Sequence, residues 1–269
     1  MDIYQSITEF YQGVTTQKQI IGRSVFGRKI YAVKMGEGSP IGIAQYAIHG
    51  REFITAKLAV AQYKIGLKKG SCWLVPLVNP DGALLSEIGI SSVRLRNQAK
   101  LLKWNNNEDF SLWKANGRGV DLNVNFDADW GQGAKNIFNP APENYVGKKP
   151  FSEPETRALR DFTLKTKPDY TLSYHTKGEE IYWYFYQSGD RKKRDFTLAE
   201  ELSKYTGYPL AYAKRSVGGY KDWCIEKLGI PSFTVETGSD SFLHPLKERE
   251  LEDVLRHNLY ALYELSARV

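Results

Sequence analysis

Cysteine is scarce in this sequence, with only two residues in 269. Cys72 lies beside Trp73 and Cys224 beside Trp223 in apolar surroundings, which favours buried free thiols over a disulfide between them. Free thiols are typical of a reducing compartment. The first residues also lack the basic and apolar regions of an export signal. The sequence as it stands therefore predicts a cytoplasmic protein, and secretion or cell-wall association stays open if the chain has been trimmed.

Long apolar runs are missing as well. No stretch reaches the roughly 18 apolar residues that a membrane-spanning helix needs, so no membrane partner is expected. Internal repeats, interdomain linkers and disordered tails are also missing, while 42% of the residues are hydrophobic, enough to form a sizeable core. We therefore predict a single domain over residues 1–269. The oligomeric state stays open.

Charge of one sign is concentrated at a single place. The net charge of +6 comes from 37 basic and 31 acidic residues spread along the chain, and the dense cluster is Arg191-Lys192-Lys193-Arg194. The aromatic and glycine signatures of RNA-binding modules are missing around it, which favours a solvated helix start or loop over a nucleic-acid interface. We expect no nucleic-acid partner, whereas a basic surface suits acidic substrates.

Apolar strands alternate with helical patterns through most of the chain. Expected strands are a pair within Gln19–Gly36, then Ile41–Ile48, Cys72–Val78, Tyr170–Tyr174, Glu180–Gln187 and Ser232–Val235. Expected helices are Ile3–Gln12, one beginning near Ile54, Ser152–Lys165 with a Ser152–Glu155 capping box, Phe196–Tyr205, Tyr220–Leu228 and Leu246–Ala267. Asn79-Pro80-Asp81-Gly82 predicts a turn, and Ala83–Trp113 is polar and irregular. The alternation predicts an α/β fold with a mostly parallel, twisted sheet covered on both faces.

The tetrapeptide His49-Gly50-Arg51-Glu52 lies where one of these strands gives way to a helix. Open α/β sheets bind their ligands at such turns. An imidazole and a carboxylate three residues apart can both reach one cation, which gives two of the three protein ligands of a catalytic zinc. A His-x-x-Glu pair also occurs by chance in a chain of this size, so a third ligand and a base are needed.

His175 and Glu236 also follow apolar strands directly, which would bring them to the same edge of the sheet. Taken alone, His175 is better explained as a hydrogen-bonded histidine at a strand end than as a metal ligand. Glu236 follows Phe233-Thr234-Val235, so its carboxylate should be partly buried and needs a cation, a donor or a raised pKa. Beside a metal-activated water it could take up the proton and pass it to a leaving amine.

Six motifs occur in an order that resembles the zinc carboxypeptidases of the M14 type, and the resemblance covers nearly the whole chain. They are His49-Gly50-Arg51-Glu52, Asn79-Pro80-Asp81-Gly82, Asp121-Leu122-Asn123, His175, Gly218-Gly219 with Asp222-Trp223, and Glu236. The resemblance implies an α/β/α sandwich with a mixed, mostly parallel sheet of about eight strands. It also implies one zinc ion and a peptide substrate.

The resemblance assigns expected roles residue by residue. His49, Glu52 and His175 match the zinc ligands, and Glu236 matches the general base and acid. Arg51 and, in a loosely matched loop, Lys114 match the cations that polarise the carbonyl and stabilise the oxyanion; for both, a surface cation is the alternative. The matches at substrate-binding positions are Asn123, which would bind the terminal carboxylate, and Tyr212, Lys214 and Lys221 near the leaving residue.

Departures from the family pattern point to the substrate. Val124 stands where digestive carboxypeptidases have an arginine that clamps the terminal carboxylate, and valine cannot form that bidentate pair. Lys214, Arg215 and Lys221 would offer a basic pocket to a substrate with additional carboxylates. These features resemble the bacterial branch with γ-D-glutamyl-meso-diaminopimelate peptidases, which cut murein peptides.

We therefore expect cleavage of the amide between D-glutamate and diaminopimelate. Related cell-wall enzymes often carry an N-terminal glycan-binding module, and its absence from this sequence favours either recycling of soluble muropeptides or a truncated chain. The alternatives are a general metallocarboxypeptidase that acts on ordinary peptides and a non-catalytic binding domain.

Overall fold

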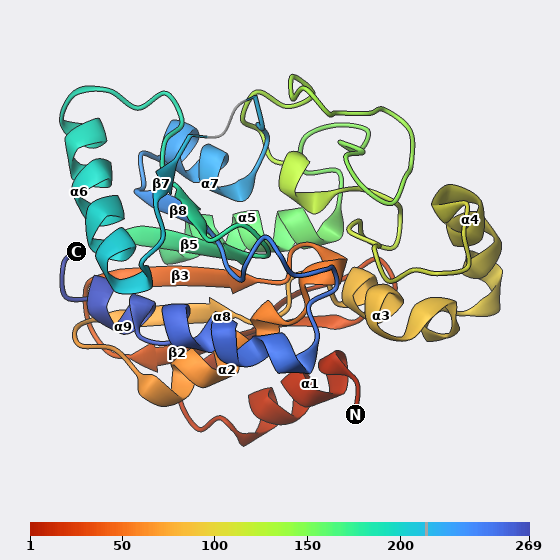
Figure 1. Cartoon of the computed structure of the whole chain (residues 1–269), viewed down its shortest axis with the longest axis horizontal. Helices are drawn as coiled ribbons and strands as arrows, with labels where there is room; N and C mark the ends of the chain where they lie inside the picture. The colour runs from red at the N-terminus through yellow and green to blue at the C-terminus, as the bar shows by residue number, and fades with distance from the viewer. Residues whose placement is uncertain (213–214) are drawn as a thin grey trace.

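A computed structural model describes residues 1–212 and 215–269, and its centre is one sheet (Figure 1). Eight strands of the described chain lie in the order β1-β2-β4-β3-β5-β8-β6-β7. Their bounds are β1 Lys18–Arg23, β2 Lys29–Gly36, β3 Ile41–Tyr46, β4 Ser71–Val75, β5 Tyr170–His175, β6 Glu180–Tyr182, β7 Leu210–Ala211 and β8 Ser232–Glu236. The central strands β4, β3, β5 and β8 are parallel, whereas β1, β2 and β6 introduce antiparallel pairs. The predicted mixed, mostly parallel sheet is confirmed.

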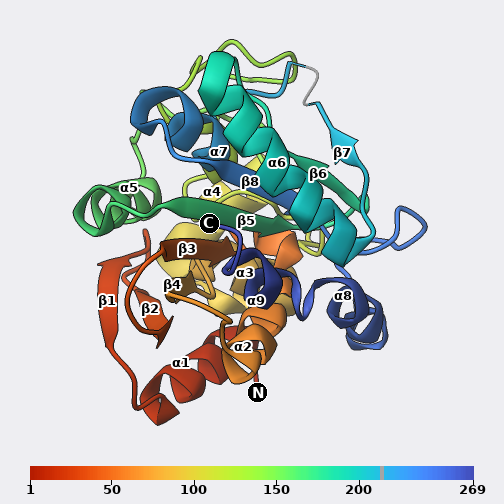
Figure 2. The same cartoon turned by 90° about the vertical axis from the view of Figure 1, so that its left-hand side faces the viewer.

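Helices cover both faces of this sheet (Figure 2). One layer consists of α1 (Ile3–Gly13), α2 (Thr55–Ile65), α6 (Gly189–Thr206), α8 (Leu251–Asn258) and α9 (Ala261–Leu265). The other consists of α5 (Pro154–Thr166) and α7 (Tyr220–Trp223), and α7 continues as a π-helical turn, Cys224–Leu228. Helices α3 (Pro80–Ile88) and α4 (Leu95–Asn105) lie beyond one end of the sheet (Figure 1).

The central strands are buried on both faces, which explains why they read as nearly continuous apolar runs. Ala44 and Tyr46 of β3 pack toward α2, and Tyr46 stacks on Tyr174 of β5 with 4.9 Å between the ring centroids. Ile43 of the same strand points into the second core beneath α5 and α7. Two cores therefore hold the sheet rigid, and the chain that leaves its carboxyl edge starts from fixed positions.

The region after β4 differs from the prediction. Asn79 is the N-cap of α3 and accepts a hydrogen bond from the Gly82 amide at 2.9 Å, while Pro80 occupies the first helical turn. The predicted turn is therefore a helix start. Ala83–Trp113 is not irregular either, because it contains most of α3 and all of α4. Helix α4 packs at the surface with Leu101 as its one buried residue.

Further boundaries were wrong as well, including the start of α6, which lies at Gly189 and not at Phe196. Helix α5 begins at Pro154 with Glu153 as N-cap, and Ser152 donates to the Glu153 side chain instead of forming a capping box. The strand predicted to reach Gln187 ends at Tyr182. Beyond it, the Gln187 side chain accepts a hydrogen bond from the Phe185 amide and donates one to the Trp183 carbonyl, in place of strand pairing. The predicted terminal helix consists of a short 3-10 turn, Glu248–Glu250, followed by α8 and α9.

Two simpler predictions, on the thiols and on the basic cluster, are confirmed. Cys72 and Cys224 are buried free thiols. The basic cluster 191–194 lies exposed in the first turns of α6. Among the helices that the structure describes, none is long and apolar enough to cross a membrane.

Candidate active site

A histidine–glutamate–histidine cluster forms where β3 and β5 end. These strands are parallel neighbours, with Tyr46 opposite Tyr174, so His49 and His175 emerge on the same edge. A single 3-10 turn, Gly50–Glu52, then brings the Glu52 side chain back toward both rings. Gly50 is required in this turn, because a Cβ there would lie 2.5 Å from the Gly82 carbonyl group.

The donor atoms of the cluster converge. Glu52 Oε1 lies 2.9 Å from His49 Nδ1, and Glu52 Oε2 lies 3.0 Å from His175 Nδ1. The two Nδ1 atoms are 3.1 Å apart. All three side chains are buried, and one potential ligand atom from each lies within 4.8 Å of the others. Two imidazoles and one carboxylate that share a point are the donor set of catalytic zinc sites, so these residues fit a zinc ion.

Asp121 supports this cluster from behind, a role that the sequence analysis missed. Its Oδ1 makes an ionic contact of 3.2 Å with His49 Nε2, without the alignment of a hydrogen bond, and its Oδ2 lies 3.0 Å from Lys114 Nζ. Burial alone would raise the pKa of Asp121, but Lys114 and His49 hold it below its usual value. An ionised carboxylate behind an imidazole fixes the ring of a ligand. The motif Asp121-Leu122-Asn123 contains this residue, but the sequence alone does not reveal its contact with His49.

Glu236 stands beside His175 at the same edge. In the sheet register His175 lies opposite Glu236, and Glu236 lies opposite Glu180. Burial raises the pKa of Glu236 to about 7, with His175 lowering it and Glu52 raising it further. Its carboxyl group lines the cavity described next, so it is placed to exchange a proton with a molecule bound there.

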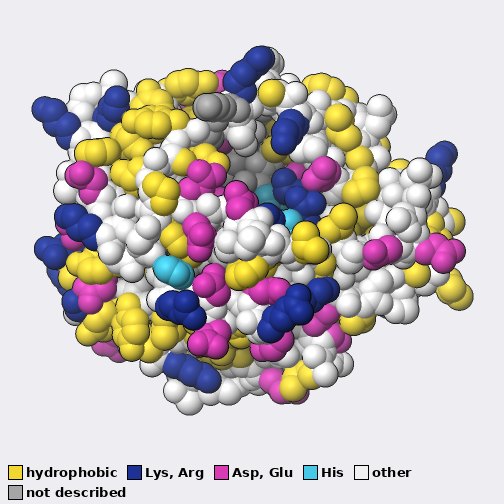
Figure 3. Space-filling model, viewed as in Figure 1, with side chains coloured by type: hydrophobic (Ala, Val, Ile, Leu, Met, Phe, Trp, Pro, Cys, Tyr) yellow, Lys and Arg dark blue, Asp and Glu magenta, His cyan; other side chains and the backbone are white. Residues whose placement is uncertain are grey.

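A cavity of about 610 Å³ opens over these strand ends. On the face shown in Figure 3, histidine, basic and acidic side chains meet in a hollow. Of the predicted site residues, the cavity wall contains His49, Arg51, Lys114, Asn123, Tyr212, Lys221 and Glu236, together with Val124. Glu52 and His175 lie just beneath it, in the histidine–glutamate–histidine cluster, which is called the metal cluster below because it fits one zinc ion. Lys214 lies outside the described residues.

Two of the wall residues have defined partners. One guanidinium nitrogen of Arg51 lies 3.4 Å from both the Leu112 carbonyl oxygen and Glu143 Oε2. The Asn123 side-chain oxygen accepts a hydrogen bond from the Tyr220 amide at 3.2 Å. This orients the Asn123 amide, whose NH₂ group donates no hydrogen bond to another of the described residues.

The charge of the cavity wall is mixed, whereas the sequence analysis expected a basic pocket. Among the described residues, five cations line it, namely Arg51, Lys114, Lys135, Arg215 and Lys221. Five carboxylates do so too, namely Asp121, Glu143, Glu180, Asp222 and Glu236. Lys221 is buried and ion-paired with Asp222, with 2.5 Å between Nζ and Oδ1. The cations are thus balanced within the wall.

Tyr212 lies at the rim of this wall. Its ring packs against those of Trp183 and Tyr184, with 5.6 and 5.5 Å between centroids, and 57% of its surface stays exposed. A mostly exposed aromatic ring at a cavity mouth is available to cover a bound molecule.

A family model described as "Zinc carboxypeptidase" matches residues 3–261. The chain belongs to the zinc carboxypeptidase family. The family consists of zinc-dependent hydrolases, so the resemblance drawn from the six motifs is confirmed. The roles of the individual site residues stay predictions, although the structure brings together the residues named for the metal and the base.

The curated relatives include bacterial and animal carboxypeptidase-like proteins. Gamma-D-glutamyl-L-diamino acid endopeptidase 1 of Lysinibacillus sphaericus is 35% identical over 91% of this chain and 65% of its own length. The uncharacterized protein YqgT of Bacillus subtilis is 31% identical over 81% of this chain and 64% of its own length. The chain thus spans slightly less than two thirds of the length of these two relatives.

Solved structures share the fold at low sequence identity. Bovine thrombin-activatable fibrinolysis inhibitor gives a TM-score of 0.77 at 21% identity, covering 100% of this chain and 96% of that one. Murein-tripeptide amidase MpaA of Escherichia coli O157 gives a TM-score of 0.62 at 23% identity, covering 94% of both chains. These likenesses confirm the predicted carboxypeptidase-like fold.

Proposed function

We propose that this chain is a zinc peptidase that hydrolyses the amide bond between the γ-carboxyl group of D-glutamate and diaminopimelate in murein peptides. The observation that supports this proposal most directly is the convergence of His49, Glu52 and His175 beside Glu236 in one cavity. The similarity to a protein named gamma-D-glutamyl-L-diamino acid endopeptidase supports the choice of bond. The buried free thiols fit a role on soluble muropeptides in a reducing compartment.

The hydrolytic step is assigned to Glu236 next to one zinc ion. A zinc ion held by His49, Glu52 and His175 would polarise the amide carbonyl and lower the pKa of a water molecule beside it. Glu236 takes a proton from the attacking water and delivers it to the nitrogen as the C–N bond breaks. The water oxygen ends on the new carboxylate, and the diamino acid leaves as a free amine.

The cations of the cavity are assigned to charge that develops during the reaction. Arg51 and Lys114 face the same space as the metal cluster, so they are placed to stabilise an oxyanion. The NH₂ group of Asn123 would donate to a carboxylate of the leaving residue. Tyr212, Lys214 and Lys221 complete the proposed substrate-binding set.

Val124 supports a substrate other than an ordinary peptide C-terminus. Its side chain lies in the cavity wall next to Asn123, where digestive carboxypeptidases have an arginine. An apolar residue there cannot pair with a carboxylate, so ordinary C-terminal residues lose a bidentate contact. A leaving residue with additional charged groups could bind through other positions instead.

The test is a digest of defined peptides by the zinc-loaded protein, followed by mass spectrometry. We expect L-Ala-γ-D-Glu-meso-diaminopimelate to release diaminopimelate, and chelation of the metal to abolish the release until zinc is returned. The control is a peptide of ordinary α-linked L-residues of the same length. Removal of the last residue from that control, with the γ-D-glutamyl bond left intact, would make the chain a general metallocarboxypeptidase. No cleavage of either peptide would indicate a binding domain.

A further inference from the structure

We infer that the buried Lys221–Asp222 ion pair recognises a zwitterionic amino acid head at the end of the leaving residue's side chain. The ligand class is a diamino dicarboxylic acid, whose distal carbon carries both an ammonium and a carboxylate. This inference rests on the proposed function and extends it, since it names the residues that distinguish a diamino diacid from a simple diamine or diacid.

Both residues of the pair can form further hydrogen bonds with a ligand. Lys221 Nζ donates to Asp222 Oδ1 at 2.5 Å and to the Tyr184 carbonyl at 3.1 Å, and it lies 5.5 Å from the centre of the Phe185 ring. Among the described residues its third N–H group therefore has no oxygen or nitrogen acceptor. Asp222 Oδ2 accepts from the Gly219 amide at 3.1 Å and can accept a further donor. Both side chains are only about 5% exposed, yet both line the cavity.

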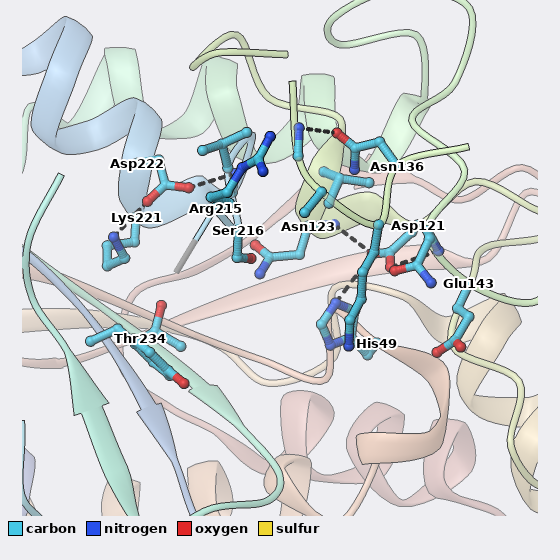
Figure 4. Close-up of a pocket in the computed structure, with 18 of the residues that line it drawn as sticks. His49, Asp121, Asn123, Asn136, Glu143, Arg215, Ser216, Lys221, Asp222 and Thr234 are labelled. Carbon is cyan, nitrogen blue, oxygen red and sulfur yellow. Dashed lines mark hydrogen bonds and ion pairs between the residues drawn. The ribbon is translucent and has the colours of Figure 1, made fainter. Parts of the chain in front are cut away.

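The position of the pair suits the end of a side chain. In Figure 4, His49 and the Lys221–Asp222 pair lie on opposite sides of the cavity, with Asn123 and Ser216 between them in that view. A leaving residue whose amide nitrogen is near the metal cluster, and whose backbone carboxylate is near Asn123, would extend its side chain toward the pair. Arg215 adds a second cation on the same wall.

A buried ion pair contributes little to folding stability, because the desolvation of two charges roughly cancels their attraction. Its presence on a cavity wall therefore needs another explanation. A zwitterionic head that docks antiparallel to the pair gives each of the four charges an additional partner of opposite sign. A ligand whose side chain ends in a single charge could pair with only one of Lys221 and Asp222. The other residue of the pair would gain no additional partner, so such a ligand should bind less tightly.

Polar side chains occupy the strand positions next to Thr234 in the cavity wall. Thr234 lines the cavity, and in the sheet register its neighbour is Ser173, whose own neighbour is Gln45. The Ser173 hydroxyl and both polar atoms of the Gln45 amide are buried without a hydrogen-bond partner among the described residues. Of these three residues Thr234 lines the cavity, and its hydroxyl group suits a polar ligand side chain better than an aliphatic one.

The first experiment removes charges from the ligand. Calorimetric titration of the zinc-loaded protein compares meso-diaminopimelate with L-lysine, which lacks the distal carboxylate, and L-2-aminopimelate, which lacks the distal ammonium. We expect meso-diaminopimelate to bind about tenfold or more tightly than either analogue. Equal affinities, or no saturable binding of meso-diaminopimelate, would overturn the inference without any variant having to fold.

The second experiment removes the pair from the protein. In the double variant Lys221→Met with Asp222→Asn, both charges are lost together, and the asparagine oxygen can still accept from the Gly219 amide. We expect the three ligands to bind this variant within about twofold of one another. The matched control is Glu226→Gln with Lys227→Met, an ion pair of 3.2 Å in the next helical turn and outside the cavity wall, which should keep the wild-type preference. A preference that survives in the cavity variant contradicts the inference.

These measurements separate the inference from the proposed function. Ligand affinity does not depend on which acyl group precedes the cleaved bond. Preferential binding of meso-diaminopimelate without cleavage of γ-D-glutamyl peptides would reject the reaction and keep the recognition site. Cleavage of γ-D-glutamyl bonds before lysine and diaminopimelate at equal rates, with equal affinities, would keep the reaction and reject the site.

Discussion

The metal cluster and the far wall of the cavity are built in different ways. His175 and Glu236 end adjacent parallel strands and are opposite each other in register, and His49 follows the next strand along. The Lys221–Asp222 pair instead comes from the first turn of α7, which follows a loop and is positioned by contacts such as Lys221 with the Tyr184 carbonyl. The sheet therefore fixes the residues proposed to react, while loops and a short helix position the residues proposed to select the substrate.

This difference predicts which amino-acid substitutions the protein should tolerate. A substitution at a strand end alters a group that the two cores hold rigid, and no neighbour can take its place. A substitution on the far wall alters one contact among several charged groups. Catalysis should thus fail abruptly at the strand ends, and specificity should shift gradually at the wall.

The largest effect is expected for Glu236→Gln. The amide cannot accept a proton from water, so turnover should fall by about a thousandfold or more, while zinc content stays at the wild-type level because the three ligands are intact. Steady-state kinetics and metal analysis of the same preparation measure both quantities. Glu179→Gln, a neighbouring carboxyl group that is not part of the cavity wall, serves as control. Wild-type turnover in the Glu236 variant would remove this residue as the base.

A smaller effect is expected for Asp121→Asn, which keeps the shape but removes the charge behind His49 and beside Lys114. Loss of such a supporting carboxylate costs about 10- to 100-fold in metal affinity. Competition with a zinc chelator measures the affinity, and His175→Ala, which removes a ligand outright, should bind no zinc in the same assay. An unchanged affinity in Asp121→Asn would make this carboxylate a partner of Lys114 alone.

The contrast between the two regions also explains what the sequence could predict. Strand ends are visible in a sequence as polar residues that follow an apolar run, and parallel strands gather their carboxyl ends at one edge. This reasoning placed His49, His175 and Glu236 together. The contact of Asp121 with His49 depends on a loop held by distant partners, such as the bond from the Asp121 amide to the Tyr145 carbonyl. Local patterns do not contain such information.

The same limit applies to the charge of the cavity. The sequence shows Lys221 next to Asp222, but adjacency does not reveal that both side chains are buried and paired. The expectation of a basic pocket counted cations without the carboxylates that other segments supply, such as Glu143 and Glu180. Helices α3 and α4 were missed for a related reason. Their buried residues pack against the loop that follows them, and the sequence does not show which segments pack together.

The smallest effect on catalysis is expected at Glu155, a buried carboxyl group outside the cavity wall. One of its oxygens accepts from the Val25 amide at 2.9 Å, and the other accepts from the Asn116 side chain at 3.1 Å. Burial raises its pKa to about 8, and the nearby Asp81 raises it further. In the unfolded chain the group ionises near pH 4.5, so between about pH 4.5 and 8 the folded protein holds a proton that the unfolded chain has lost.

The free energy of unfolding should therefore decrease as the pH rises through this window, by at most about 1.4 kcal/mol per pH unit from this group. In Glu155→Gln that contribution disappears, so the melting temperature of the variant relative to wild type should increase steadily from pH 5 to pH 8, while turnover of the folded enzyme stays the same. Thermal unfolding followed by circular dichroism over that range measures the slope, with the exposed Glu108→Gln as control. Parallel curves for Glu155→Gln and wild type would mean that Glu155 is already ionised in the folded state. A loss of turnover at constant stability would instead mean that the site extends through Asn116 to Glu155. Residues away from the strand ends would then also matter for catalysis.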